Sequence, residues 1–267
     1  MKKGFMKKGF MMAVIALMVG IMATGAWAIT YTPGDTTYGS VYAPDSHGSM
    51  TIGSGGYACE YNTFLWYSGL TESQVAYDTS TGAVSGFGLD TSLSYSLLDS
   101  DTDLILFYTI TNTTGSDITG LKFFAFLDVE IDEAKNTYGN EKGEKVAGTG
   151  EWEIDEPGYV SGNIYDNLFA GQLDNLASPF GPEDISMALG WTWGNLAAGE
   201  TTGFYVMISE DGDSMGETAL HQWDPDSLST DIYLSGAPIP EPATLLLLGS
   251  GLAGLAGLGR KRFIKKE

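Results

Sequence analysis

The stretch DLILFYTITNTTGSDITGLKFFAFLDVEI, residues 103–131, is the strongest indication of how this chain folds. Two runs rich in Ile, Leu, Phe, Tyr and Thr flank a polar segment, TTGSDITG, that contains turn-forming residues. β-branched and aromatic runs bounded by Gly, Asn, Asp and Ser are typical of strands and turns. We therefore predict a long β-hairpin over residues 103–131.

The second arm of this predicted hairpin divides its side chains between two faces, because residues i and i+2 share one face of a strand. One face is wholly apolar and should point into the core: Phe123, Ala125, Leu127, Val129 and Ile131. The opposite face combines aromatic and acidic side chains: Phe124, Phe126, Asp128, Glu130 and Asp132.

Similar segments recur along the rest of the chain up to residue 237. We predict further strands over residues 57–67, 83–89, 93–98, 151–155, 159–165, 185–193, 203–209 and 231–234. Apolar residues at helical spacing over long runs are missing, and the polar residues 132–150 are predicted to be a mobile loop. The pattern predicts an all-β fold, a single β-sandwich of jelly-roll or immunoglobulin-like character.

Charge is distributed very unevenly along the chain. Of 13 basic residues, four lie in residues 2–8 and five in residues 260–266, whereas nearly all of the 34 acidic residues lie between these ends. Such a negative body repels nucleic acid and anionic lipid, so we expect no nucleic-acid partner. The single cysteine, Cys59, excludes an intramolecular disulfide, and stability must come from an ordinary core.

The N-terminal 28 residues have the organisation of a secretory signal peptide. Lysines are followed by the apolar stretch FMMAVIALMVGIM, and small residues then end in Ala26-Trp27-Ala28, an AxA-type cleavage site. Cleavage after Ala28, with Ala26 as the other recognition residue, would leave an exported body that starts at residue 29.

The C-terminal residues 238–267 form a second targeting segment. Residues 243–259 carry no charge and would span about 25 Å as a helix, slightly less than a hydrocarbon layer of about 30 Å. The basic tail at residues 260–266 follows at once, and its first residues, Arg260, Lys261 and Arg262, should stay cytoplasmic under the positive-inside rule. We expect both ends at the inner leaflet and the acidic body outside.

Pro240-Glu241-Pro242, followed by Ala243-Thr244, a leucine-glycine span and a basic end, resembles the PEP-CTERM sorting signal of Gram-negative bacteria. The resemblance implies a membrane-embedded exosortase as partner, which cuts near the motif and transfers or releases the body outside the cell. It also implies a surface or biofilm-matrix protein in a bacterium that makes exopolysaccharide. Pro240, Glu241 and Pro242 are then substrate residues, and their prolines favour an extended, accessible chain.

A catalytic role for the body has little support in the sequence. Gly212-Asp213-Ser214-Met215-Gly216 matches the GxSxG nucleophile elbow, but only His221 follows and no alternating strand-helix pattern surrounds it. His47 and His221 are the only histidines, so a zinc site is not expected. Pairs among the many carboxylates could serve a glycosidase, but chance supplies such pairs in an acidic chain. We expect no enzyme and no catalytic residue.

Calcium is the metal ion that this composition favours, because calcium takes oxygen ligands. The candidate groups are Asp99, Asp101 and Asp103; Asp128, Glu130 and Asp132; and Asp211 with Asp213. None completes an EF-hand, since Leu104 and Gln222 stand where Gly and Glu are required. We expect a solvated acidic face and no cofactor, with calcium as the alternative.

Tryptophans are the residues that would reveal a sugar-binding surface, because sugar rings stack on flat indoles. Trp191 and Trp193 share one face of a predicted strand, which suits either a sugar platform or, preferably, the core. The other candidates are Trp66, Trp152 and Trp223. The leading prediction is a structural or adhesive surface protein; the alternatives are a carbohydrate-binding module and a secreted glycoside or ester hydrolase.

Overall fold

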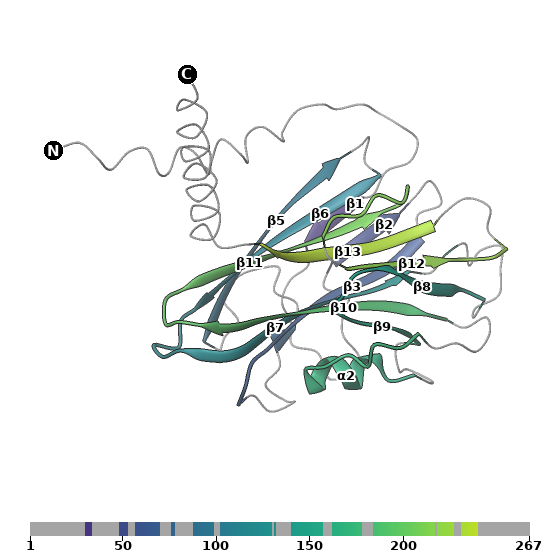
Figure 1. Ribbon diagram of the computed structural model, residues 1–267. Coiled ribbons are helices and arrows are strands. Elements are labelled where there is room, and N and C mark those ends of the chain that lie inside the picture. The colour runs from purple at the N-terminus through teal and green to yellow at the C-terminus, as the bar shows by residue number, and fades with distance from the viewer. Residues whose placement is uncertain are drawn as a thin grey trace, which may run out of the picture.

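The computed structural model describes residues 30–33, 48–52, 57–69, 76–77, 88–98, 102–129, 131, 140–156, 162–177, 184–216, 218–226 and 231–239. These residues form two antiparallel sheets packed face to face, with one short helix on the outside (Figure 1). The predicted all-β sandwich is confirmed.

A seven-stranded sheet has the order β1-β2-β3-β7-β10-β9, with β4 paired to β3. Its strands are β1 (Thr30–Pro33), β2 (Gly48–Ile52), β3 (Tyr57–Trp66), β4 (Ala76–Tyr77), β7 (Ile118–Val129), β9 (Glu151–Asp155) and β10 (Ser186–Leu196). A six-stranded sheet has the order β5-β6-β11-β13-β12-β8. Its strands are β5 (Leu89–Leu98), β6 (Asp103–Asn112), β8 (Lys142–Ala147), β11 (Thr201–Ser209), β12 (Thr218–Trp223) and β13 (Asp231–Ile239).

The predicted hairpin over residues 103–131 is wrong in its pairing, although both strands exist. β6 pairs with β5 and β11 in one sheet, whereas β7 pairs with β3 and β10 in the other. The two strands face each other across the core, where the rings of Tyr108 and Phe123 lie 4.9 Å apart. Stacking two apolar faces removes more apolar surface from water than placing the strands edge to edge, so the connection crosses between sheets.

Asn112 stabilises this crossing between the sheets. Its side-chain amide donates to Ser116 O at 2.8 Å and to Leu196 O at 2.9 Å, while its carbonyl oxygen accepts from Thr114 N at 3.0 Å. Gly115 follows with a φ of 79°, which a glycine adopts without strain. The buried side chain thus ties the turn at Thr114 and Ser116 to the end of β10 at Leu196.

The main core lies between the sheets and confirms the predicted inward face of β7. The residues of that face are fully buried there: Phe123, Ala125, Leu127, Val129 and Ile131. The opposite face of β7 is not solvated where its aromatic residues lie. Phe124 and Phe126 are also fully buried, in a second cluster beneath helix α2 (Ile164–Ala170).

Helix α2 corrects the strand predicted over residues 159–165, because Ile164 and Tyr165 are helical. Its buried residues, Ile164, Tyr165, Leu168 and Phe169, recur at helical spacing and cover the outer face of the seven-stranded sheet. The helix has only seven residues, and polar residues interrupt its apolar positions. A segment of this length shows too few repeats for a helical period to be recognised in the sequence. Gly171, with a φ of 73°, ends the helix and donates to Leu168 O at 3.1 Å.

Several other segments differ from their predictions. The predicted loop over residues 132–150 contains β8, an edge strand that pairs with β12. Its sequence, KGEKVA, is mostly polar and so does not show the apolar alternation typical of a strand. β12 was not predicted at all, and β5 begins at Leu89, with residues 83–87 outside the described residues. β13 begins as predicted but continues to Ile239, beyond the predicted end of the body at residue 237.

Candidate functional site

The predicted targeting residues lie outside the described part of the structure. These residues are Ala26 and Ala28, the motif Pro240, Glu241 and Pro242, the span 243–259, and Arg260, Lys261 and Arg262. Within the described residues, no helix has the length and apolar character needed to cross a bilayer. The described residues nearest to the motif in the chain are Pro238 and Ile239, which end β13.

The junction between body and motif is built into the six-stranded sheet. β13 lies between β11 and β12, and its last residues pair with β11, Pro238 opposite Phe204 and Ile239 opposite Gly203. Gly203 leaves room for the isoleucine, because a Cβ at residue 203 would stand 3.1 Å from Ile239 Cδ1. Both Pro238 and Ile239 are half-buried. The chain therefore reaches the motif directly from a strand of the sheet.

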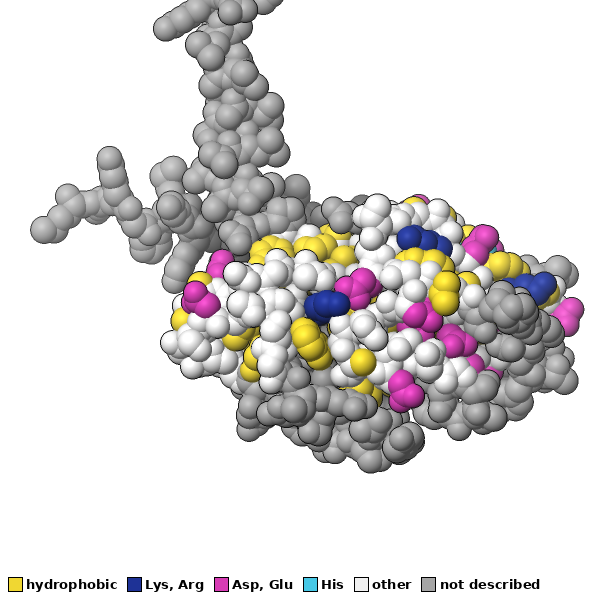
Figure 2. Space-filling model, turned by 60° about the horizontal axis from the view of Figure 1, so that its bottom comes forward, with side chains coloured by type: hydrophobic (Ala, Val, Ile, Leu, Met, Phe, Trp, Pro, Cys, Tyr) yellow, Lys and Arg dark blue, Asp and Glu magenta, His cyan; other side chains and the backbone are white. Residues whose placement is uncertain are grey.

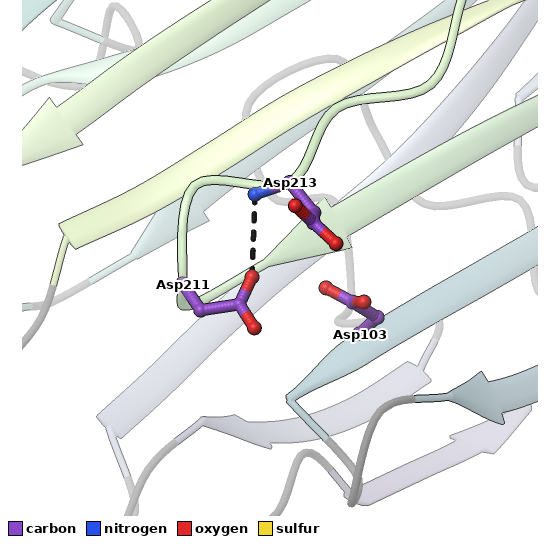
Figure 3. Close-up of side chains that lie close together, drawn as sticks. All are labelled: Asp103, Asp211 and Asp213. Atoms are coloured by element: carbon purple, nitrogen blue, oxygen red, sulfur yellow. Dashed lines mark hydrogen bonds between the residues drawn. The ribbon is translucent and has the colours of Figure 1, made fainter.

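Three aspartates from two of the predicted groups come together at one end of the six-stranded sheet (Figure 3). Asp103 begins β6, and Asp211 and Asp213 lie in the turn after β11. One carboxylate oxygen of each lies within 4.8 Å of the others. The pairing of β6 with β11 places Asp103 opposite Ser209 and so brings the two groups together.

The turn after β11 is held by hydrogen bonds to Asp211. Oδ1 accepts from Ser209 Oγ at 2.9 Å and from Asp213 N at 3.2 Å, and Oδ2 accepts from Thr102 Oγ1 at 3.1 Å. Partial desolvation raises the pKa of Asp211, but these hydrogen bonds lower it more, so its pKa lies below the ordinary value of 3.8. This carboxyl stays ionised in mildly acidic solution.

The three carboxylates match calcium in ligand type but supply only part of a coordination shell. Calcium takes about six to eight oxygen ligands, so carbonyl and water oxygens would have to complete the set. Asp103 is buried, whereas Asp211 and Asp213 are exposed. Of the other predicted candidates, Asp128 is buried rather than on a solvated face, and Asp99, Asp101, Glu130 and Asp132 lie outside the described residues.

The GxSxG segment lies in the same connection between β11 and β12. Ser214 is exposed, and the adjacent Met215 N donates to Ser235 Oγ at 3.1 Å. His221, the only later histidine, lies on β12, where its ring nitrogens stand 3.4 Å from Glu144 and 3.4 Å from Asp231. His47 lies outside the described residues.

His221 is the centre of an aromatic group on the outer face of the six-stranded sheet, which we call the outer aromatic patch: Trp223, His221 and Tyr233. The imidazole stacks on Tyr233 with ring centroids 4.4 Å apart and on Trp223 at 4.7 Å. Antiparallel pairing places His221 opposite Tyr233. Glu144 and Asp231 flank the patch. Sequence reasoning missed this patch because β12 and β8 were not predicted.

The other described tryptophans belong to the core or its margin. Trp191 is buried and stacks on Phe123 with ring centroids 6.0 Å apart, and Trp193 packs against the same core, which confirms the preferred prediction for this pair. Trp152 also packs against the main core, and Trp66 packs against the cluster beneath α2. Trp223 lies on the outer face of the six-stranded sheet.

Glu153 is a second carboxylate with a shifted pKa. It lies on β9, and its side chain accepts hydrogen bonds from α2 and the segment that follows. Burial raises its pKa to about 7, although hydrogen bonds from Asn167 and Asp174 act in the opposite direction. Asn167 Nδ2 donates to both carboxylate oxygens, at 2.9 and 3.0 Å, and Asp174 N donates to one at 3.2 Å. These hydrogen bonds attach the segment 163–174 to β9, so we assign Glu153 a structural role.

Comparison with known families shows where this chain has relatives. Residues 238–262 match the family model described as the PEP-CTERM protein-sorting motif, which agrees with the resemblance seen in the tail. No curated protein matches the chain, and no solved structure matches it. The chain thus carries the signal of an exported protein that an exosortase sorts to the cell surface through the membrane.

Proposed function

We propose that the β-sandwich body is a structural or adhesive component of the cell surface or of a biofilm matrix rich in exopolysaccharide. In this proposal the chain is exported by its N-terminal signal, held in the inner membrane by residues 243–259 and cut by exosortase at Pro240-Glu241-Pro242. The observation that carries it is the sorting motif, which follows the last strand of the sandwich directly. The body then needs no catalytic residue of its own.

The surface of the body supports a role outside the cell. Acidic side chains outnumber basic ones on the described surface seen in Figure 2, in keeping with the charge of the sequence. A negative surface favours solubility and disfavours nucleic acid and anionic lipid as partners. A serine hydrolase is not favoured, because a carboxylate faces each ring nitrogen of His221, Glu144 at Nδ1 and Asp231 at Nε2, whereas a catalytic histidine directs one nitrogen at the serine.

The test of this proposal is processing in cells that express an exosortase. We expect wild-type chains to lose the tail and reach the surface or medium, and mass spectrometry should find a new N-terminus at residue 29. Glu241→Ala should stay intact in the inner membrane, while Glu267→Ala, an acid-to-alanine control beyond the basic tail, should be processed normally. Equal distribution of wild type and Glu241→Ala would refute recognition of the motif.

Carbohydrate binding is a second candidate function, favoured by the outer aromatic patch. His221 stacks on both neighbouring rings, so a sugar ring would stack on the faces of Trp223 and Tyr233 that turn away from the imidazole. The flanking carboxylates of Glu144 and Asp231 can accept hydrogen bonds from hydroxyl groups. Because these flanking groups are acidic, a neutral polysaccharide is the expected ligand.

Affinity electrophoresis in gels that contain hydroxyethyl-cellulose, dextran or xylan tests this second candidate. We expect retardation of the wild-type protein in at least one gel and its loss in Trp223→Ala. Tyr95→Ser is the matched control, because Tyr95 is an exposed aromatic residue on β5, at the opposite edge of the same sheet from β8. Equal mobility of wild type and Trp223→Ala in every gel would contradict the patch as a sugar site.

A further inference from the structure

The sorting motif and the fold share residues. The family match begins at residue 238, whereas β13 extends to Ile239. Pro238 and Ile239 therefore belong both to the sorting segment and to the six-stranded sheet. The motif at Pro240 follows the last residue of β13 with no residue between them.

The end of β13 is held more weakly than its middle. Among the described residues, β12 pairs with β13 only as far as Gly236, opposite Thr218, and the last three residues of β13 have their described pairs with β11. Pro238 lies in this one-sided stretch, where a residue without an N–H is tolerated. Ile239 still packs over Gly203, and Ala237 is buried. Strand ends of this kind open locally far more readily than strand centres.

The remaining chain between the body and the predicted span is very short. Residues 240–242 extend over about 10 Å at most. A body of about 210 residues has a radius of gyration of about 17 Å. The radius of the sandwich therefore exceeds the length of the tether, residues 240–242. The body must lie close to the membrane surface while the span is intact.

We propose that the fold of the body limits access to its own sorting motif. The last three residues of β13 must separate from β11 before exosortase can bind the chain on both sides of its cut, so processing competes with closure of the six-stranded sheet. This inference rests on the proposed function, in which exosortase cuts near Pro240-Glu241-Pro242. In this inference, two residue pairs of the sheet slow the processing: Ile239 with Gly203, and Pro238 with Phe204.

An insertion that lengthens the tether without changing the motif tests the inference. Gly-Ser-Gly-Ser-Pro-Ile is placed between Ile239 and Pro240, so that Pro-Ile still precedes the motif while the native Pro238 and Ile239 stay in β13. The control carries the same six residues between Gly148 and Thr149, both exposed, in the turn between β8 and β9. Both are compared with wild type by pulse-chase in cells that express exosortase.

We expect the insertion before Pro240 to raise the first-order rate of tail removal several-fold, and the control insertion to leave it unchanged. A wild-type or slower rate for the insertion before Pro240 overturns the inference while leaving the proposed function intact. If none of the chains is processed, or if Glu241→Ala is processed like wild type, the proposed function fails and this inference with it.

Discussion

Gln222 on β12 donates a hydrogen bond from Nε2 to Oε2 of Glu141 over 2.8 Å, in the interior between the two sheets. The same nitrogen lies 2.9 Å from Val129 O and 3.1 Å from Ile185 O, which belong to the opposite side of the sandwich. Glu141 in turn accepts from Ile131 N at 2.8 Å. A buried polar network thus joins the sheets at the end where β7 stops.

Replacement of Gln222 by leucine should destabilise the fold by about 2–4 kcal/mol, because it leaves the buried Glu141 carboxylate and two carbonyl groups with fewer donors. Urea unfolding followed by tryptophan fluorescence measures this change. Leu220→Met, a nearly volume-conserving change at a buried position of the same strand, should cost less than about 1.5 kcal/mol. A Gln222→Leu protein as stable as Leu220→Met would contradict the importance of the network.

Gly171→Ala should destabilise the protein by more than Gly199→Ala. Both glycines have positive φ, 73° and 77°, so both substitutions carry the strain of a left-handed conformation, about 1 kcal/mol. Only residue 171 is crowded as well: a Cβ there would stand 2.6 Å from the Trp66 ring, whereas nothing lies within 4 Å at residue 199. The difference between the free energies of unfolding of the two variants, obtained from urea denaturation, measures the cost of crowding Trp66 where α2 packs on the sheet. Equal losses of stability would refute this tight packing.

Stability should fall as pH rises from about 4.5 to about 7 because of Glu153. Its pKa is raised from 4.5 to about 7, so the folded state holds a proton that the unfolded state has lost over this interval. The loss should be at most about 3 kcal/mol, and the contribution should be constant above pH 7. Thermal unfolding from pH 4.5 to 8 checks this prediction. Glu153→Gln should flatten the profile relative to wild type; parallel profiles would show that burial does not perturb this carboxyl.

Asp213→Asn should raise the melting temperature slightly at low ionic strength, because it relieves repulsion among three carboxylates whose oxygens lie within 4.8 Å. Asp90→Asn, on the exposed face of β5, serves as the control for loss of one negative charge. Millimolar calcium should raise the melting temperatures of wild type and Asp213→Asn equally. A calcium-dependent rise confined to wild type would instead establish a calcium site at Asp103, Asp211 and Asp213.

Local patterns predicted eight of the thirteen described strands at least in part, but not their partners. The alternation of β7 predicted which residues enter the core, and the boundaries predicted for β9 agree with the structure. The same reasoning paired β6 with β7, because adjacent strands with a turn between them most simply form a hairpin. The edge strand β8 was not predicted, because it buries little of its surface and needs no apolar alternation.

The candidate sites also differ in whether they depend on local sequence or on strand pairing. The sorting motif was recognised from the sequence because it is a continuous segment, and the family match confirms it. The aspartate cluster was predicted as two separate groups, and the outer aromatic patch was not predicted. Asp103 lies far from Asp211 in the chain, and His221 reaches Tyr233 and Glu144 only through strand pairing. No local spacing encodes such contacts.

By itself, the sequence determined the β-rich character of the body, the inward face of β7 and the sorting motif, because side-chain alternation and linear signals are properties of neighbouring residues. The tertiary structure decided that β6 and β7 lie in opposite sheets, that α2 covers Phe124 and Phe126, and that β13 runs into the sorting segment. These features depend on which apolar faces and strand edges meet, and that choice minimises exposed apolar surface and unpaired backbone over the whole chain.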